Sequence, residues 1–235
     1  MSKQATLDIS DELIQNAYRV LKAVGEKANS GEKQQLIEEE KFVELQIRYD
    51  MEGDKKNTPR IVELKHSLFS AEDGDSAILL TGRNDTTTKE YLTEHPIPGL
   101  TKVTSMDKVR TTFATHEQRR NLLRSYKRFL CDNAILPMMG SVLGNKAFQM
   151  NKQPYPVNLK STASLEKNIT KALSSTMFFV NCGSLISIKV GRISFTEEQI
   201  VDNVKLVIPA VLKYIDMNNI LSVGFTVGKI DRDEV

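Results

Sequence analysis

The 235-residue sequence contains no tryptophan, only two cysteines and three histidines, and few aromatic residues, at 6%. Cys131 and Cys182 are too few for a disulfide framework and lack the spacing of a zinc site. We expect two reduced, partly buried thiols. His66, His95 and His116 lie far apart, without metal-ligand spacing. The sequence therefore predicts neither a disulfide scaffold nor a metal centre.

Long apolar runs are also missing. No apolar stretch approaches the ~20 residues that a membrane span requires. The first four residues, Met-Ser-Lys-Gln, lack the apolar region of a secretory signal. With 40% hydrophobic and 26% charged residues, the composition is that of a folded globular protein. We expect a soluble intracellular protein that does not associate with a membrane.

The charge is small in total but unevenly distributed. The formal net charge is +2, whereas residues 1–54 carry −5 and residues 102–160 carry +8, with eleven Lys and Arg against three acids. A basic segment can hold a polyanion even when the whole chain is close to neutral. The alternative is a solvated surface that keeps the protein soluble, and charge alone leaves both interpretations open.

Residues 140–146, Gly-Ser-Val-Leu-Gly-Asn-Lys, come nearest to a phosphate-binding loop. A P-loop needs four residues between its glycines, and a lysine followed by serine or threonine directly after the second glycine. Here three residues separate the glycines, Asn145 intervenes, and Ala147 follows the lysine. No dinucleotide fingerprint and no activated cysteine–histidine pair is evident. The sequence predicts a protein that is not an enzyme and takes no cofactor or small-molecule substrate.

Periodicity predicts the secondary structure. A helix is expected over 8–30, with apolar residues recurring at three- and four-residue steps: Leu13, Ala17, Val20, Leu21 and Val24. Strands are expected at 42–49, 60–64, 77–80, 102–104, 187–193 and 221–227, and further helices near 86–94, 106–122, 136–150, 165–173 and 195–217. Thr196 and Gln199 fit a capping box at the start of the last helix.

Two polar stretches divide the chain. Residues 70–76 and 160–164 read as linkers, and strands alternate with helices between them, which indicates βαβ units. We expect a discontinuous outer domain, 1–75 plus 160–235, and an inserted domain, 76–159, joined by a double hinge at Ser70–Ser76 and Lys160–Ser164. Residues 117–131 fit either a helix or, from Tyr126, a strand, and periodicity favours the helix.

Three groups of segments stand out along the chain: residues 60–68; residues 136–140, 143–146 and 154–157; and residues 182–195 with 201–204. In their order from about Phe42 to Val227 they resemble the ribosomal protein L1 family, with Lys65 where the family has proline. The resemblance implies an α/β protein of two domains: an α+β outer domain of split βαβ type, and an inserted Rossmann-like, three-layer α/β domain. It also implies a strand, not a helix, at Tyr126–Cys131.

The resemblance further implies a non-enzymatic RNA-binding ribosome-biogenesis factor. It would bind pre-rRNA in nucleolar pre-ribosomal particles, with other assembly factors and ribosomal proteins as partners. Ribosomal members end their last strand with Ser-Ser-Thr-Met-Gly-Pro-Gly, whereas Phe225–Ile230 departs from this pattern, which favours the nucleolar branch. The alternatives are a large-subunit stalk protein that binds mature rRNA, and would be cytoplasmic, and a nucleotide-binding enzyme that uses the inserted domain.

The expected RNA contacts combine basic side chains, an aromatic ring and a glycine. An ammonium beside an aromatic ring suits a phosphate and an unpaired base, a glycine permits close approach, and an arginine at an exposed strand end binds phosphate bidentately. The alternatives are a core role for Phe42 and an ion pair from Arg192 to Glu197 or Glu198. The candidates are Lys41, Phe42, Lys146, Lys152, Lys189, Gly191, Arg192, Thr226 and Lys229.

Overall fold

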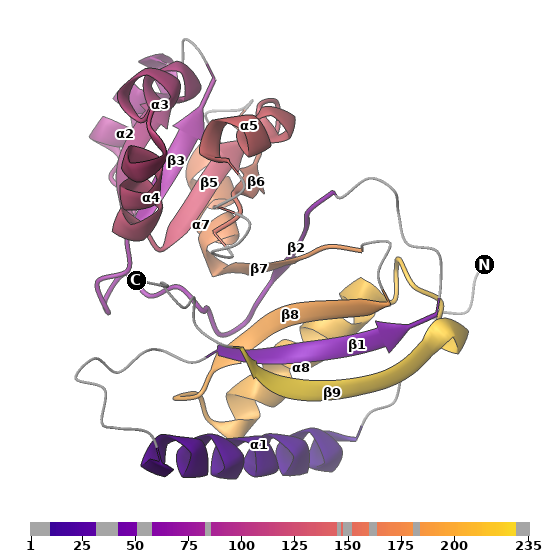
Figure 1. Ribbon diagram of the computed structural model, residues 1–235. Helices are drawn as coiled ribbons and strands as arrows, with labels where there is room; N and C mark the ends of the chain where they lie inside the picture. Colours follow the sequence, from indigo (N-terminus) through magenta and orange to yellow (C-terminus); the bar gives the residue numbers. More distant parts are fainter. Residues whose placement is uncertain are drawn as a thin grey trace. The chain divides into compact units, whose positions relative to one another are not determined.

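The computed structural model describes residues 10–31, 42–50, 58–82, 86–144, 147, 152–159, 164–180 and 184–228. The chain forms two compact units: unit 1, Met1–Leu68 with Ser175–Val235, and unit 2, Phe69–Ser174 (Figure 1). The chain crosses between them after Leu68 and after Ser174, rather than at the two polar stretches. The helix near 165–173, expected in the outer domain, therefore belongs to unit 2.

Unit 1 is built on a three-stranded antiparallel sheet in the order β8-β1-β9, formed by β8 (Leu185–Arg192), β1 (Phe42–Tyr49) and β9 (Ile220–Gly228). Along β1 the odd-numbered residues are buried and the even-numbered ones are not, which gives the sheet one apolar and one polar face. Helices α1 (Asp11–Gly31) and α8 (Glu197–Val211) pack on the apolar face.

Helix α1 forms where it is predicted, but it is rotated relative to the expected apolar row. Ile14 and Tyr18 are buried, whereas Leu13 and Val20 are 63% and 65% exposed. The Tyr18 hydroxyl donates to the carbonyl oxygens of Ile193 and Phe195, both at 2.9 Å, and so fixes the orientation of the helix against the loop after β8. The apolar periodicity of the sequence did not predict these contacts of Tyr18.

A two-stranded ribbon lies where the chain leaves unit 1 and returns to it. Strand β2 (Arg60–Glu63) pairs antiparallel with β7 (Ser175–Phe178), a strand that periodicity did not predict. Glu63 is opposite Ser175 in this pairing. The outgoing and returning segments of unit 1 are therefore neighbours.

Unit 2 is a three-layer α/β unit. Its parallel sheet has the order β4-β3-β5-β6, from β4 (Leu100–Ser105), β3 (Ala77–Thr81), β5 (Arg128–Asp132) and β6 (Tyr155–Val157). Alternate residues of β3 pack in two separate cores. One core includes α2 (Thr86–Glu94) and α7 (Leu165–Ser174); the other includes α3 (Met106–Thr112), α4 (His116–Ser125) and α5 (Met139–Leu143). The α/β fold class is confirmed.

The segment that fitted both helix and strand contains one of each. Helix α4 ends at Ser125 and β5 begins at Arg128. The single helix expected over 106–122 is instead α3 and α4, because Thr115 caps a new helix: its hydroxyl accepts from the Gln118 amide, and the Gln118 side chain accepts from the Thr115 amide. A 3₁₀ turn, η1 (Leu136–Met138), precedes α5.

Across the described residues, no helix has the length and apolar character to cross a membrane. No three His, Cys, Asp or Glu side chains in these residues come together as a metal site would require. Cys131 is a free thiol buried in β5, and burial raises its pKa to about 12. At neutral pH this thiol is protonated, so it is a poor nucleophile.

Candidate nucleic-acid interface

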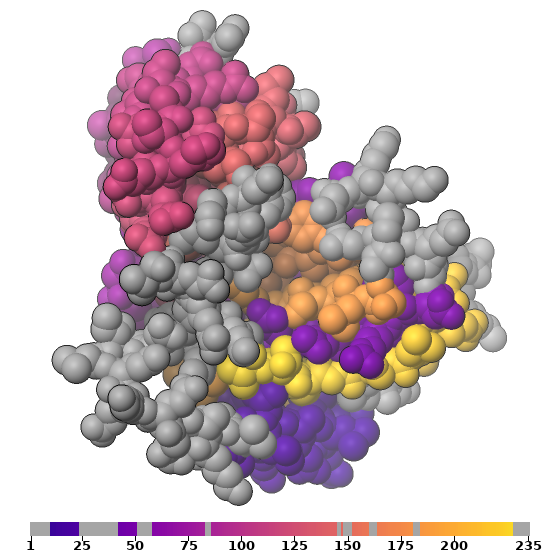
Figure 2. Space-filling view, in the orientation of Figure 1, coloured from indigo at the N-terminus to yellow at the C-terminus, as the bar shows by residue number. Residues whose placement is uncertain are grey.

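Of the helices of unit 1 that the structure describes, none packs on the polar face of the sheet (Figures 1 and 2). We call it the open face, and it consists of the side of β1, β8 and β9 opposite the core. Strand register places Glu44 of β1 directly between Lys189 of β8 and Thr226 of β9. The residues of the open face are Phe42, Glu44, Gln46, Arg48, Leu185, Ser187, Lys189, Ser222, Gly224 and Thr226.

A cation lies over a ring at one end of this face. The Lys189 Nζ is 4.9 Å from the centroid of the Phe42 ring. Phe42 is half-buried. It packs against the core, as the alternative interpretation had it, and it also forms part of the open face. Next to this pair, the Ser187 hydroxyl donates to the Glu44 carboxylate. The arrangement offers an ammonium, a ring and hydroxyl groups on one rigid surface.

Three candidates from the sequence, Phe42, Lys189 and Thr226, therefore share the open face. Sequence reasoning missed its other polar members, Gln46 and Ser222 among them, although the two-residue period of β1 marks every second residue as facing away from the core. Three further candidates lie outside the described residues: Lys41, Lys146 and Lys229.

Arg192 is the main correction to the predicted site. It was expected to project from an exposed strand end, but it is only 8% exposed. Its Nε and Nη2 donate to the Leu68 carbonyl oxygen at 3.1 and 2.7 Å. Glu197, one of the two acids considered as an alternative partner, forms its hydrogen bonds with Arg19, both at 2.8 Å. Arg192 thus holds the segment that leads out of unit 1.

Gly191 approaches a helix closely rather than a sugar-phosphate. The β1–β8 register shifts by one residue, so that Glu44 pairs with Lys189 but Val43 pairs with Gly191. This β-bulge turns Gly191 toward the core. A Cβ built on Gly191 would clash with the Cδ1 of Ile200 in α8. The missing side chain therefore lets α8 pack on the sheet.

We expect Gly191→Ala to lower the free energy of unfolding by about 1–2 kcal/mol, because an extra methyl group overpacks this core. Gly224→Ala is the matched control: Gly224 is exposed on the same sheet, and a Cβ there would meet nothing within 4 Å. Urea denaturation of both variants tests the difference. Equal stabilities would contradict the steric explanation.

Lys152 belongs to unit 2, and its ammonium is already engaged there. Its Nζ donates to the Leu123 carbonyl oxygen at the end of α4. This side chain ties the segment before β6 to the helix layer. It does not contribute to the open face.

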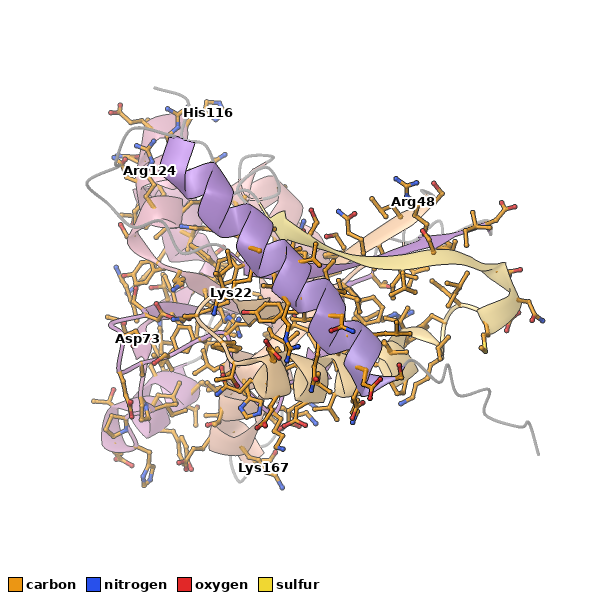
Figure 3. All side chains as sticks on the ribbon, turned by 90° about the horizontal axis from the view of Figure 1, so that it is seen from below. Lys22, Arg48, Asp73, His116, Arg124 and Lys167 are labelled. Atoms are coloured by element: carbon orange, nitrogen blue, oxygen red, sulfur yellow. The ribbon has the colours of Figure 1, made fainter. Side chains whose placement is uncertain are left out.

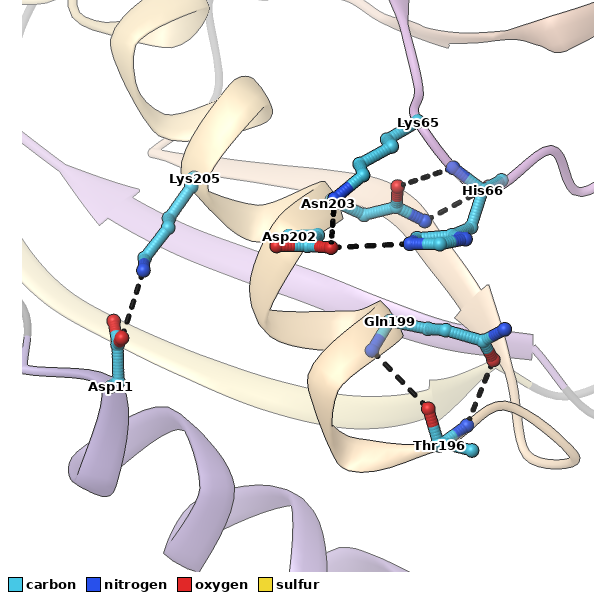
Figure 4. Close-up of polar contacts among 8 residues, drawn as sticks. All are labelled: Asp11, Lys65, His66, Thr196, Gln199, Asp202, Asn203 and Lys205. Carbon is cyan, nitrogen blue, oxygen red and sulfur yellow. Dashed lines mark hydrogen bonds and ion pairs between the residues drawn. The ribbon is translucent and has the colours of Figure 1, made fainter.

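Two segments noted in the sequence, residues 60–68 and 201–204, meet around one buried amide (Figure 4). Asn203 is fully buried; its Oδ1 accepts from the His66 amide at 3.0 Å, and its Nδ2 donates to the carbonyl oxygens of His66 and Val190 at 2.9 and 2.8 Å. Hydrogen bonds from Lys65 and His66 hold the pKa of the Asp202 carboxyl below its usual range. These residues maintain the fold of unit 1.

The beginning of α8 agrees with the sequence-based expectation. The Thr196 hydroxyl accepts from the Gln199 amide, and the Gln199 side chain accepts from the Thr196 amide, as in a capping box (Figure 4). The helix ends at Val211, earlier than predicted. It packs on the apolar face of the sheet, on the side opposite the open face.

The sequence pattern of the Ribosomal protein L1p/L10e family matches residues 26–227, which include all of unit 2 and most of unit 1. The chain belongs to this family. The resemblance that the motifs suggested is thereby confirmed. A Schizosaccharomyces pombe protein named for ribosome biogenesis is 31% identical over 118 residues, 49% of this chain and 32% of that protein.

Two further relatives extend the comparison. The mouse protein named Ribosomal L1 domain-containing protein 1 is 27% identical over 150 residues, 61% of this chain and 33% of its own length. The large ribosomal subunit protein uL1 of the archaeon Methanoregula boonei is 22% identical over 114 residues, 48% of this chain and 52% of its own length. The L1 domain of this chain thus matches about a third of the fission yeast and mouse proteins.

Proposed function

We propose that this L1-domain protein is a non-enzymatic ribosome-biogenesis factor that binds pre-rRNA in nucleolar pre-ribosomal particles through its open face. The observation that carries the proposal is the juxtaposition of Lys189, Phe42 and Thr226 on the sheet face opposite α1 and α8. The printed names of the fission yeast and mouse relatives support the link to ribosome biogenesis. Its partners would be assembly factors and ribosomal proteins in the same particles.

The open face suits an unpaired RNA segment. Sequence-specific RNA recognition mostly targets unstacked bases, which stack on aromatic rings while cations hold the phosphates. The Phe42 ring supplies the stacking surface once the Lys189 ammonium, which lies over the ring in the free protein, moves to the adjoining phosphate. The hydroxyls of Ser187 and Thr226 offer partners for the ribose 2′-OH. Because these groups stand on paired strands, little conformational entropy is lost on binding.

A second candidate function is that of a stalk protein in the mature large subunit. The similarity to the archaeal uL1 protein favours it. The departure of Phe225–Gly228 from the ribosomal Thr-Met pattern favours the biogenesis role. Sedimentation of cell extracts separates the two functions, because a stalk protein co-sediments with translating polysomes and a biogenesis factor with pre-ribosomal particles.

RNA binding is expected to be strongly salt-dependent. With four or five phosphate contacts, at about −0.7 each on single strands and about −0.9 each on duplex, the slope of log affinity against log salt should be roughly −3 to −4. Filter binding of the full chain to labelled pre-rRNA fragments, at several salt concentrations, measures this slope. A flat response, or no binding to any fragment, would refute the proposed function.

A further inference from the structure

The charge of the molecule is divided between its two units. By sequence, unit 1 contains 17 Lys and Arg against 20 Asp and Glu, a net −3, whereas unit 2 contains 15 against 10, a net +5. The open face therefore belongs to the unit with negative net charge. Long-range attraction of a polyanion must come mainly from unit 2.

The positive charge of unit 2 is concentrated in residues 102–128, which hold eight Lys and Arg against two acids. Arg128, Lys127 and Arg119 contribute to the fold of unit 2. Arg128 is buried and donates to the carbonyl oxygens of Ala172 and Leu173. Lys127 pairs with Asp75 at 2.7 Å, and the Arg119 Nε donates to the Phe113 carbonyl at 3.0 Å.

Other cations of this segment lie on the outer surfaces of α3 and α4. Lys108 and Arg110 are exposed on α3, and Arg120 and Arg124 are exposed on α4. His116, Arg120 and Arg124 follow one another at four-residue steps and so line one side of the helix. Figure 3 labels His116 and Arg124, the first and last residues of this row. We call Lys108, Arg110, Arg120 and Arg124 the basic surface.

We propose that the basic surface is a second RNA-binding site, which binds the phosphate backbone without sequence specificity. The inference rests on the proposed function for the identity of the RNA, and it adds unit 2 to the binding interface. Four exposed cations share α3 and α4 with only two acids, Asp107 and Glu117. Such a surface favours a densely charged polyanion.

The surroundings of the basic surface distinguish RNA from a protein partner. Protein interfaces depend on buried aromatic or apolar anchors at their centre. Among the described residues, none of the exposed large hydrophobic side chains lies on α3 or α4. A nucleic-acid backbone needs no such anchor, because its affinity comes from charge neutralisation.

Helix α4, which carries Arg120 and Arg124, is fixed by its N-terminal cap and by packing against the core. Its first turn is closed by the Thr115–Gln118 capping box, and Leu122 and Leu123 are buried in the core of unit 2. Arg120 and Arg124 are one turn apart, a rise of about 6 Å, which is comparable to the step between successive phosphates of one strand. Each guanidinium can bind a phosphate bidentately. The geometry suits consecutive phosphates.

Two sites on one chain would reinforce each other. The units are joined by two chain crossings, so RNA held on the open face remains at high local concentration near unit 2. The open face would select an unpaired segment, and the basic surface would hold the adjoining backbone. Because the basic surface contacts only the backbone, its loss should lower the affinity for all RNAs by a similar factor.

The test compares two double variants of the full chain that each remove two positive charges from unit 2. Arg120→Ala/Arg124→Ala alters the basic surface. Lys167→Ala/Lys171→Ala is the matched control, because both lysines are exposed on α7, which packs on the opposite side of the sheet. The probe is a fluorescent stem-loop RNA with a single-stranded tail, and anisotropy gives the affinity at several salt concentrations.

We expect the arginine variant to bind at least tenfold more weakly than the wild type, with a salt slope less steep by about 1–2. The lysine variant should lose less than threefold. Equal losses in both variants would overturn the proposal, since net charge alone would explain them. Unchanged affinity of the arginine variant would also overturn it and would leave an acidic protein as the alternative occupant.

Open-face variants and basic-surface variants test the two sites separately. If open-face variants lose RNA affinity while Arg120→Ala/Arg124→Ala retains it, only the second site is refuted. If the wild type binds none of the RNAs, the proposed function and the second site both fail.

Discussion

The double variant Phe42→Leu/Lys189→Gln should bind single-stranded pre-rRNA segments about 100-fold more weakly than the wild type. Stacking of a base on an aromatic ring contributes about 1–3 kcal/mol, and a hydrogen bond from a charged group about 1.5–3 kcal/mol. Because the cation lies over the ring in the free protein, the two effects are coupled and should not add fully. We therefore expect a loss of about 3 kcal/mol.

These substitutions are chosen to spare the fold. Leucine retains apolar volume where Phe42 packs against the core, and glutamine retains most of the stem of Lys189. Lys213→Gln is the control, because it removes one positive charge at an exposed position after α8, away from the open face. Filter binding and thermal melts on the same preparations decide the outcome. Unchanged RNA affinity with an unchanged melting temperature would exclude the open face as the binding site.

Local sequence patterns anticipated most of the elements. The alternation in Phe42–Tyr49 predicted β1 with its bounds, and Thr196 with Gln199 predicted the start of α8. The missed strands β6 and β7 are short, at three and four residues, and β7 follows α7 without an intervening turn. Strands of this length carry too little alternation to be recognised from periodicity alone.

The site was harder to predict than the fold, because its composition depends on pairing between distant strands. The juxtaposition of Lys189 with Phe42 follows from the β1–β8 register, which joins residues about 150 positions apart. The bulge that turns Gly191 inward is likewise a property of the paired strands. Lys189 lies on the open face, where its predicted role requires it, whereas Arg192 is buried and donates to a backbone carbonyl.

Arg192→Ala should destabilise unit 1 by about 2–4 kcal/mol and leave the RNA affinity of the folded protein within about twofold of the wild type. The buried guanidinium makes two hydrogen bonds to the Leu68 carbonyl oxygen, the last carbonyl of unit 1 before the chain crosses to unit 2. Alanine removes both donors and leaves a cavity, and it weakens the attachment of a segment that Asn203 also holds through His66.

The Arg192→Lys variant tests whether the positive charge of this side chain is sufficient without the two-nitrogen donor geometry of the guanidinium. A lysine ammonium can reach a carbonyl oxygen but cannot donate through two nitrogens of a planar fork, so we expect only partial recovery of stability. Lys205→Ala is the control; it breaks an exposed ion pair with Asp11 and should cost less than about 0.5 kcal/mol. Urea denaturation measures the stabilities, and filter binding measures the RNA affinity of the same samples. Normal stability with lost RNA affinity would instead identify Arg192 as an RNA ligand, because an arginine that merely holds Leu68 cannot be removed without weakening the fold.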